Sequence, residues 1–151
     1  MSKGLRAFGH PLHAVLSDFP VALLGTSLLW DALGVWRGEA VWWAISFWNM
    51  ALGLVIALVA AMAGAVDYAA IKERDRALKL ATTHMVVMLL AVSLYAASLL
   101  ARGGPLPPAG ATRIVALILE SAGLILLVVG GWCGGHLVFH HGVGSDQSAD
   151  G

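Results

Sequence analysis

The apolar residues of this chain come in four long runs, separated by short polar stretches. The runs cover residues 13–36, 41–66, 80–101 and 113–137. Each is at least about 20 residues long, the length of helix that crosses roughly 30 Å of hydrocarbon. Within each run the apolar residues are continuous rather than confined to one stripe, as expected for a helix surrounded by lipid. The pattern therefore predicts four transmembrane helices.

The connections between the predicted helices are short, at residues 37–40, 71–79 and 103–112. Short connections make consecutive helices antiparallel neighbours, so we expect an all-α, up-down-up-down, four-helix membrane bundle in a single domain over residues 1–141. No long internal repeat is visible in the residue identities. Residues 142–151 are small and polar, and we expect them to form a disordered tail.

The composition agrees with a membrane protein. The 151 residues are 59% hydrophobic and only 12% charged, about half the charged fraction of an ordinary soluble domain. The formal net charge is zero, so no basic surface argues for binding nucleic acid. The single cysteine, Cys133, excludes an intrachain disulfide. Residues 1–9 do not look like a cleavable signal, so the first helix is expected to be retained.

The distribution of lysine and arginine predicts the orientation. The side that holds the N-terminus and the second connection has six of them: Lys3, Arg6, Lys72, Arg74, Arg76 and Lys79. The opposite side has three: Arg37, Arg102 and Arg113. Because cytoplasmic loops are the more basic ones, we expect a multi-pass protein of the bacterial inner membrane with both termini in the cytoplasm.

All the histidines fall at one end of the predicted bundle. His10 and His13 open the first helix, and His84 lies about one turn into the third. The other three, His136, His140 and His141, lie where the fourth helix ends, and Asp67 reaches the same face from the second helix. Ionisable groups inside membrane spans are costly, so such a layer is a candidate functional site.

Three interpretations of this layer remain open. Two neutral imidazoles from different helices can bind a haem iron from both sides. Alternatively, three or four histidines together with Asp67 could hold a bare zinc, copper or iron ion. The histidines could also be interfacial anchors of a scaffold subunit without a cofactor.

Two carboxylates, Asp31 and Glu120, lie at the opposite end, each about 8–10 Å in from its helix end. They could share a proton, but we expect them to stay neutral and hydrogen-bonded, because no lysine or arginine within a predicted span is available to neutralise them. No phosphate loop, nucleophile elbow, HExxH or CxxC motif is present. An electron carrier or binding protein is therefore favoured over an enzyme.

Several short motifs resemble a known family. They are Gly9-His10-Pro11-Leu12-His13, Phe19-Pro20, Asp31 with Gly34, Asp67-Tyr68, the histidine early in the third helix, and Gly134-Gly135 leading to His141-Gly142-Val143-Gly144. Nearly the whole chain resembles the bacterial four-helix membrane family called domain of unknown function 2231. Some members are fused to Rieske iron–sulfur domains, which would imply electron transfer. By motif, the resemblance implies His10, His13, His84 and His141 as site residues, whereas His136 and His140 depart from the family pattern.

The leading hypothesis is a small protein like a b-type cytochrome. It would bind haem b non-covalently near the cytoplasmic face, with His13 and His84 as one axial pair and His10 and His141 as further ligands or a second pair. Covalent attachment of the c type is excluded, since that needs a CxxCH sequence. Any redox partner would be a separate protein. A homo-oligomer through the glycine-rich face of the fourth helix is a further expectation.

Overall fold

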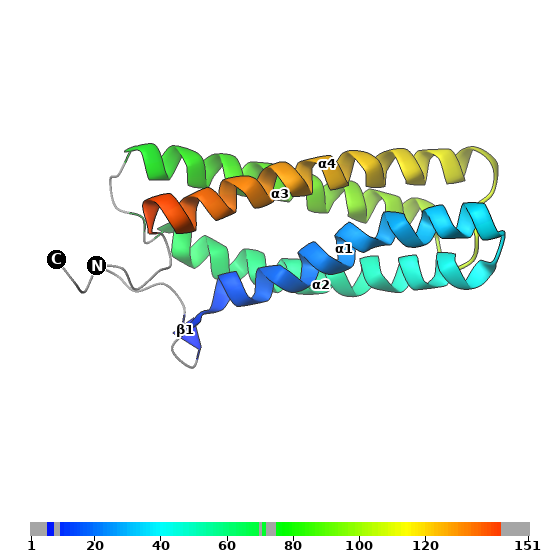
Figure 1. Ribbon diagram of the computed structural model, residues 1–151, viewed down its shortest axis with the longest axis horizontal. Coiled ribbons are helices and arrows are strands. Elements are labelled where there is room, and N and C mark those ends of the chain that lie inside the picture. The colour runs from blue at the N-terminus through cyan, green and yellow to red at the C-terminus, as the bar shows by residue number, and fades with distance from the viewer. Residues whose placement is uncertain (1–5, 8–9, 70, 72–74, 143–151) are drawn as a thin grey trace.

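The computed structural model describes residues 6–7, 10–69, 71 and 75–142. It contains four long helices: α1 (Leu12–Arg37), α2 (Ala40–Ala69), α3 (Asp75–Arg102) and α4 (Gly110–His141). They run alternately up and down along one common direction (Figure 1). Ahead of α1, the two-residue strands β1 (Arg6–Ala7) and β2 (His10–Pro11) pair antiparallel. The expected all-α, four-helix membrane bundle is confirmed.

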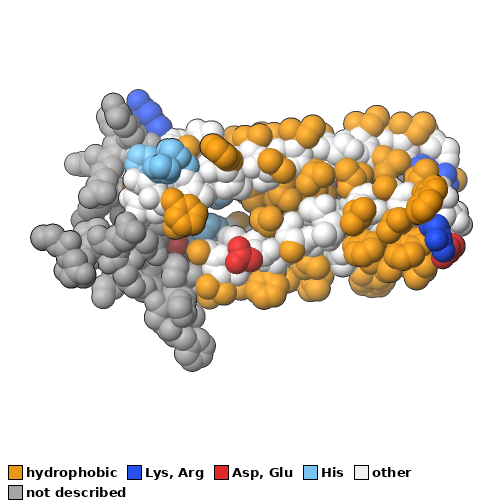
Figure 2. Space-filling model, in the orientation of Figure 1, with side chains coloured by type: hydrophobic (Ala, Val, Ile, Leu, Met, Phe, Trp, Pro, Cys, Tyr) orange, Lys and Arg blue, Asp and Glu red, His pale blue; other side chains and the backbone are white. Residues whose placement is uncertain are grey.

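The sides of the bundle are apolar along most of its length. All four helices are long and apolar enough to cross a membrane. Large apolar side chains such as Leu29, Val55, Ile118 and Val128 lie more than half exposed. In Figure 2 such side chains cover the sides of the bundle, while lysines and arginines lie near its ends. A surface of this kind is stable in contact with lipid rather than water.

The helices extend beyond the apolar runs that predicted them. The third helix begins at Asp75 rather than at residue 80, and the fourth ends at His141 rather than at residue 137. A hydropathy run marks the part of a helix in hydrocarbon, whereas backbone hydrogen bonds continue into the interface. Helix α4 ends at Gly142, which adopts the left-handed conformation (φ 62°) and donates its N–H to the carbonyl of Leu137. The rest of the predicted tail, residues 143–151, lies outside the described residues.

The bundle consists of two helical hairpins. Helix α1 packs along α2 and α3 packs along α4, while the contacts between the two hairpins are sparser (Figure 1). The central core draws on all four helices, with Leu24 from α1, Met50 from α2, Ala91 and Tyr95 from α3, and Leu127 from α4. Helices from both hairpins thus meet around a continuous apolar centre.

The inward-facing positions of the two hairpins follow the same register. Positions of α1 and α3 correspond at a separation of 71 residues: His13 with His84, Pro20 with Ala91, Leu24 with Tyr95, Ser27 with Ser98, and Asp31 with Arg102. Positions of α2 and α4 correspond at a separation of 70: Ser46 with Ala116, Met50 with Glu120, Gly53 with Gly123, Ala60 with Gly130, and Ala63 with Cys133. This repeat is not visible in the sequence, because the corresponding inward-facing positions mostly hold different residue types.

Candidate functional site

His13 of α1 is held by the backbone of its hairpin partner α2. Its Nδ1 lies 2.7 Å from the carbonyl oxygen of Ala60. A carbonyl only accepts hydrogen bonds, so Nδ1 must be the donor, and in the neutral ring Nε2 keeps its lone pair. The ring also lies against Gly64, where a Cβ would come within 2.8 Å of it. Only glycine allows this close approach of the ring to α2.

His84 of α3 repeats this arrangement on α4. Its Nδ1 lies 2.8 Å from the carbonyl oxygen of Gly130, and a Cβ at Gly134 would lie 3.0 Å from its ring. The hydrogen bond again makes Nδ1 the donor and leaves Nε2 as the atom able to bind a metal. In both hairpins the carbonyl and the glycine stand four residues apart, Ala60 with Gly64 and Gly130 with Gly134.

The two histidines face each other across the interface between the hairpins. Their ring centres are 6.4 Å apart and their planes are nearly perpendicular, at 81°. Two imidazoles that bind one metal ion from opposite sides at about 2.0–2.1 Å have ring centres roughly 6 Å apart. The spacing of His13 and His84 is thus close to that of two ligands of one metal.

The surroundings of the pair are built from small residues. Ala60, Ala63, Ala77 and Ala81 are buried at this end of the bundle, and Cys133 is buried on α4. The bulky core side chains Leu24, Met50, Tyr95 and Leu127 lie farther along the bundle. This end of the bundle therefore has less side-chain bulk than the apolar core.

At the opposite end, three charged side chains form a buried ion network. Arg102, the last residue of α3, donates from Nη1 to Oδ1 of Asp31 at 3.0 Å. Its Nη2 bonds to the second oxygen of Asp31 and to Oε1 of Glu120. Arg102 is 1% exposed, and both carboxylates are fully buried. Ser98 also donates to Oε1 of Glu120 at 2.7 Å.

This network corrects the expectation that no cation is available for Asp31 and Glu120. Arg102 lies one residue beyond the third apolar run (residues 80–101), and in the sequence it counts with the loop charges of that side. The long Arg102 side chain leaves the last turn of α3 and reaches the carboxylates of α1 and α4. The two carboxylates at matching depth were the signal in the sequence that could have pointed to a cation beside them. Asp31 and Arg102 are moreover equivalent positions of the two hairpins.

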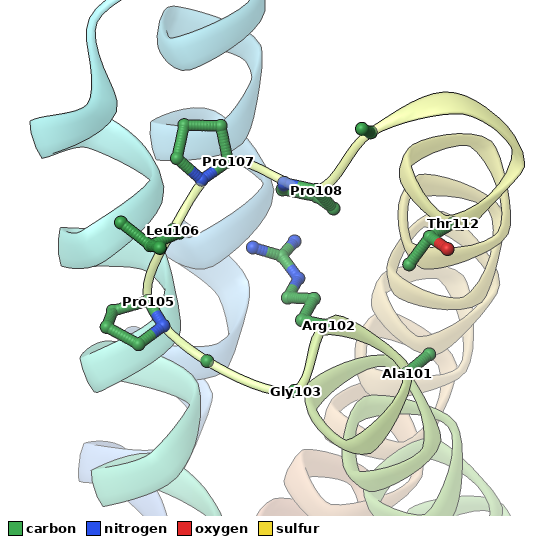
Figure 3. Close-up of a pocket in the computed structure, with 10 residues that line it drawn as sticks. Ala101, Arg102, Gly103, Pro105, Leu106, Pro107, Pro108 and Thr112 are labelled. Atoms are coloured by element: carbon green, nitrogen blue, oxygen red, sulfur yellow. The ribbon is translucent and has the colours of Figure 1, made fainter.

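A hollow leads to this network from the loop between α3 and α4. It has a volume of about 550 Å³ and is lined by the loop residues 103–109 together with Ala101, Arg102 and Thr112. In Figure 3 the loop arches around the hollow, and the Arg102 side chain projects from the end of α3 into the space that Leu106, Pro107 and Pro108 surround. Arg102 thus belongs both to the buried network and to the lining of the hollow.

Comparison with known families accounts for nearly the whole chain. The family described as Predicted membrane protein (DUF2231) matches residues 9–147. The chain belongs to this family. The matched region includes His13 and His84 as well as Asp31, Arg102 and Glu120. No curated protein and no solved structure matches the chain.

The structure brings together only some of the motif histidines that the resemblance to DUF2231 singled out. His141 lies with its ring centre 5.6 Å from that of His136, which stacks on His140 at 4.2 Å. The ring contacts of these three residues are with one another, at the end of α4. His10 belongs to β2, but its side chain lies outside the described part of the structure, so its role stays a prediction. The motif pair that does meet is His13 with His84.

The carboxylates near the histidine end occupy different settings. Asp67 is half-buried in the last turn of α2, whereas Asp18 is exposed on the outside of α1. Among the side chains that the structure describes, at residues 12–69, 71 and 77–142, no group of three or more histidines, cysteines, aspartates or glutamates is arranged to hold a metal ion. His13 and His84 are the histidines from different helices whose rings lie against each other in the described part of the structure.

Proposed function

We propose that this membrane protein binds haem b between His13 and His84 and carries electrons. The observation that supports this most is that the two imidazole rings share one tautomer. Each donates Nδ1–H to a helix carbonyl, so each presents the lone pair of Nε2. The hydrogen bonds fix both the tautomer and the ring orientation, which is the role that outer partners have at metal sites.

Haem is favoured over a bare ion by the number of ligands. A zinc-type site needs three or four protein ligands that converge on one point, whereas two imidazoles, those of His13 and His84, meet in the described structure. A haem iron already has four ligands from its macrocycle and needs only two more from the protein. His13 and His84, which come from two different hairpins and lie with ring centres 6.4 Å apart, would hold such an iron.

In this proposal the chain's residues bind, orient and shield the group. Haem would supply a one-electron couple, with a potential set by its axial ligands and its surroundings. Ala60 and Gly130 would hold the ligand rings through their carbonyls, and Gly64 and Gly134 would leave the rings room against the helix backbones. The chain has one cysteine, too few to hold an iron–sulfur cluster, so electrons would pass to or from a redox centre outside these residues.

The orientation proposed from the basic residues places this site near the cytoplasmic face of the bacterial inner membrane. A reporter that is active only in the cytoplasm, fused after residue 151, tests this, with the same reporter inserted at residue 104 as its counterpart. Activity from the terminal fusion alone supports the proposal. Activity from the loop insertion alone would place the histidine end on the outside.

The direct test is an absorption spectrum of the detergent-purified protein, oxidised and then reduced, with metal analysis of the same sample. Haem held by two histidines gives a Soret band and sharpened visible bands on reduction, and both should be lost in His13→Ala and in His84→Ala. The matched control is the double variant His136→Ala/His140→Ala, which should keep the haem. Stoichiometric metal without a Soret band would favour the bare-ion site. Absence of both, even with haem supplied during expression, would leave the histidines as structural residues.

A further inference from the structure

We infer that Glu120 carries an exchangeable proton, which makes the buried network at the loop end of the bundle a proton-binding site. The inference does not depend on the cofactor proposed for the histidine end. It starts from the inventory of charges and hydrogen bonds around Arg102, the one cation in ion-pair contact with Asp31 and Glu120 among the described residues.

The two carboxylates are not bonded alike. Asp31 accepts hydrogen bonds from both terminal guanidinium nitrogens of Arg102, one on each carboxylate oxygen. This is the bidentate geometry of an ionised carboxylate with arginine. On Glu120, Oε1 accepts hydrogen bonds from the Ser98 hydroxyl and from Nη2 of Arg102, the nitrogen that also bonds Asp31. Its other oxygen, Oε2, is buried and has no hydrogen-bond partner among the described residues. Arg102 thus makes two hydrogen bonds to Asp31 and one to Glu120.

The bare oxygen identifies the atom that holds the proton. A buried carboxylate oxygen without a donor is expensive, because burial removes the water that would otherwise stabilise its charge. Placing a proton on Oε2 makes Glu120 a neutral acid and leaves Oε1 as the carbonyl oxygen that accepts the two donors. The network then holds one ionised carboxylate, Asp31, against one guanidinium.

No other described group near the network donates a hydrogen bond to Oε2 of Glu120 in place of this proton. Helix α1 contributes Asp31, and α3 contributes Tyr95, whose hydroxyl is buried and also lacks a partner among the described residues. Helix α2 contributes the Trp43 ring, whose centre lies 5.5 Å from the guanidinium carbon of Arg102. The other buried residues in this half of α2, Ser46, Met50 and Gly53, do not titrate. On α4, Arg113 lies over the same ring at 5.5 Å and donates to the carbonyl of Pro108, not to a carboxylate.

The fold also provides a route for exchange. Arg102 lines the hollow beneath residues 103–109 (Figure 3), so the network is one side chain away from the loop end of the bundle. Protons would enter and leave from that side, at the opposite end from His13 and His84. The ligand of this site is the proton itself, taken up as Glu120 passes from carboxylate to carboxylic acid.

The test is infrared spectroscopy of the full-length protein in detergent at neutral pH, in water and in heavy water. A protonated carboxylic acid gives a C=O stretching band that is resolved from the amide bands and shifts on deuteration. We expect the wild type to show this band and Glu120→Gln to lack it. Ser98→Ala should shift it to higher frequency, because the carbonyl oxygen Oε1 loses a hydrogen bond. Ser93→Ala, whose hydroxyl bonds only the Leu89 carbonyl of its own helix on the exposed surface, should leave it unmoved.

Two results would overturn the inference. If the wild type shows no carboxylic acid band, both carboxylates are ionised and the network is a plain ion triad. If the band survives Glu120→Gln, or is insensitive to Ser98→Ala, the proton belongs to another acid. Should Glu120→Gln fail to fold, the response to Ser98→Ala decides the question by itself.

Discussion

Asp31 and Arg102 occupy equivalent positions of the two hairpins and form an ion pair across the bundle. The same register that pairs them at one end pairs His13 with His84 at the other. Each pair joins α1 to α3, the helices of different hairpins. The two hairpins, which contact each other sparsely elsewhere, are therefore joined by polar pairs near both ends and by the apolar core between them.

Loss of Arg102 should destabilise the bundle strongly. Arg102→Met leaves buried carboxyl groups without their cation, and removal of one partner from a buried ion pair costs about 3–5 kcal/mol. We expect a large fall in the midpoint of thermal unfolding in detergent. The triple variant Arg102→Met/Asp31→Asn/Glu120→Gln should recover much of that loss, because no unpaired charge remains. A triple variant as unstable as the single one would show that packing of Arg102, not its charge, stabilises this end.

Glycine beside the His13 ring should be required for cofactor binding. Gly64→Ala would place a Cβ 2.8 Å from the ring, so the ring must shift and its bond to the Ala60 carbonyl must lengthen. We expect a lower haem content, or an altered reduced spectrum, at nearly unchanged helix content. Gly131→Ala is the control, since a Cβ there meets no atom within 4 Å. Equal spectra for the two variants would contradict the proposed ligand environment.

Gly34 should be intolerant of a methyl group for a different reason. A Cβ at this position would lie 2.6 Å from the indole nitrogen of Trp43, which is itself buried beside Arg102. Gly34→Ala should therefore cost about 1–3 kcal/mol of stability through overpacking. In Gly25→Ala, on the same helix, the new Cβ would meet only Leu127 at 3.9 Å, and little change is expected. Thermal unfolding of both variants in one detergent provides the comparison.

Substitutions at Tyr95 can separate the contribution of its ring to stability from that of its hydroxyl. The residue is fully buried in the core cluster, but its hydroxyl has no partner among the described residues. Tyr95→Phe should change stability by less than about 1 kcal/mol, whereas Tyr95→Ala should cost about 3–5 kcal/mol by opening a cavity, as for other large aromatic residues. A large loss in Tyr95→Phe would instead indicate that an internal water bonds the hydroxyl.

Part of the histidine site was predictable from the sequence, and part was not. The position of His13 and His84 near one membrane face follows from helix count and alternation, which need only the hydropathy pattern. Their facing orientation does not, because the direction of a side chain around its helix depends on how the hairpins pack. The hydrogen bonds to the Ala60 and Gly130 carbonyls could not be predicted from the sequence either. Every residue has a backbone carbonyl, and the sequence does not indicate which one a histidine will contact.

By itself the sequence determined the membrane setting, the four helices, their alternation and the end at which the histidines gather. These features follow from the length and continuity of apolar runs, a local property of the chain. Only the tertiary structure decided that Arg102 turns into the bundle to meet Asp31 and Glu120, and that both hairpins share one register of buried positions. Such relationships join residues far apart in the chain, and they depend on helix rotation and on close packing between helices, which a one-dimensional pattern does not specify.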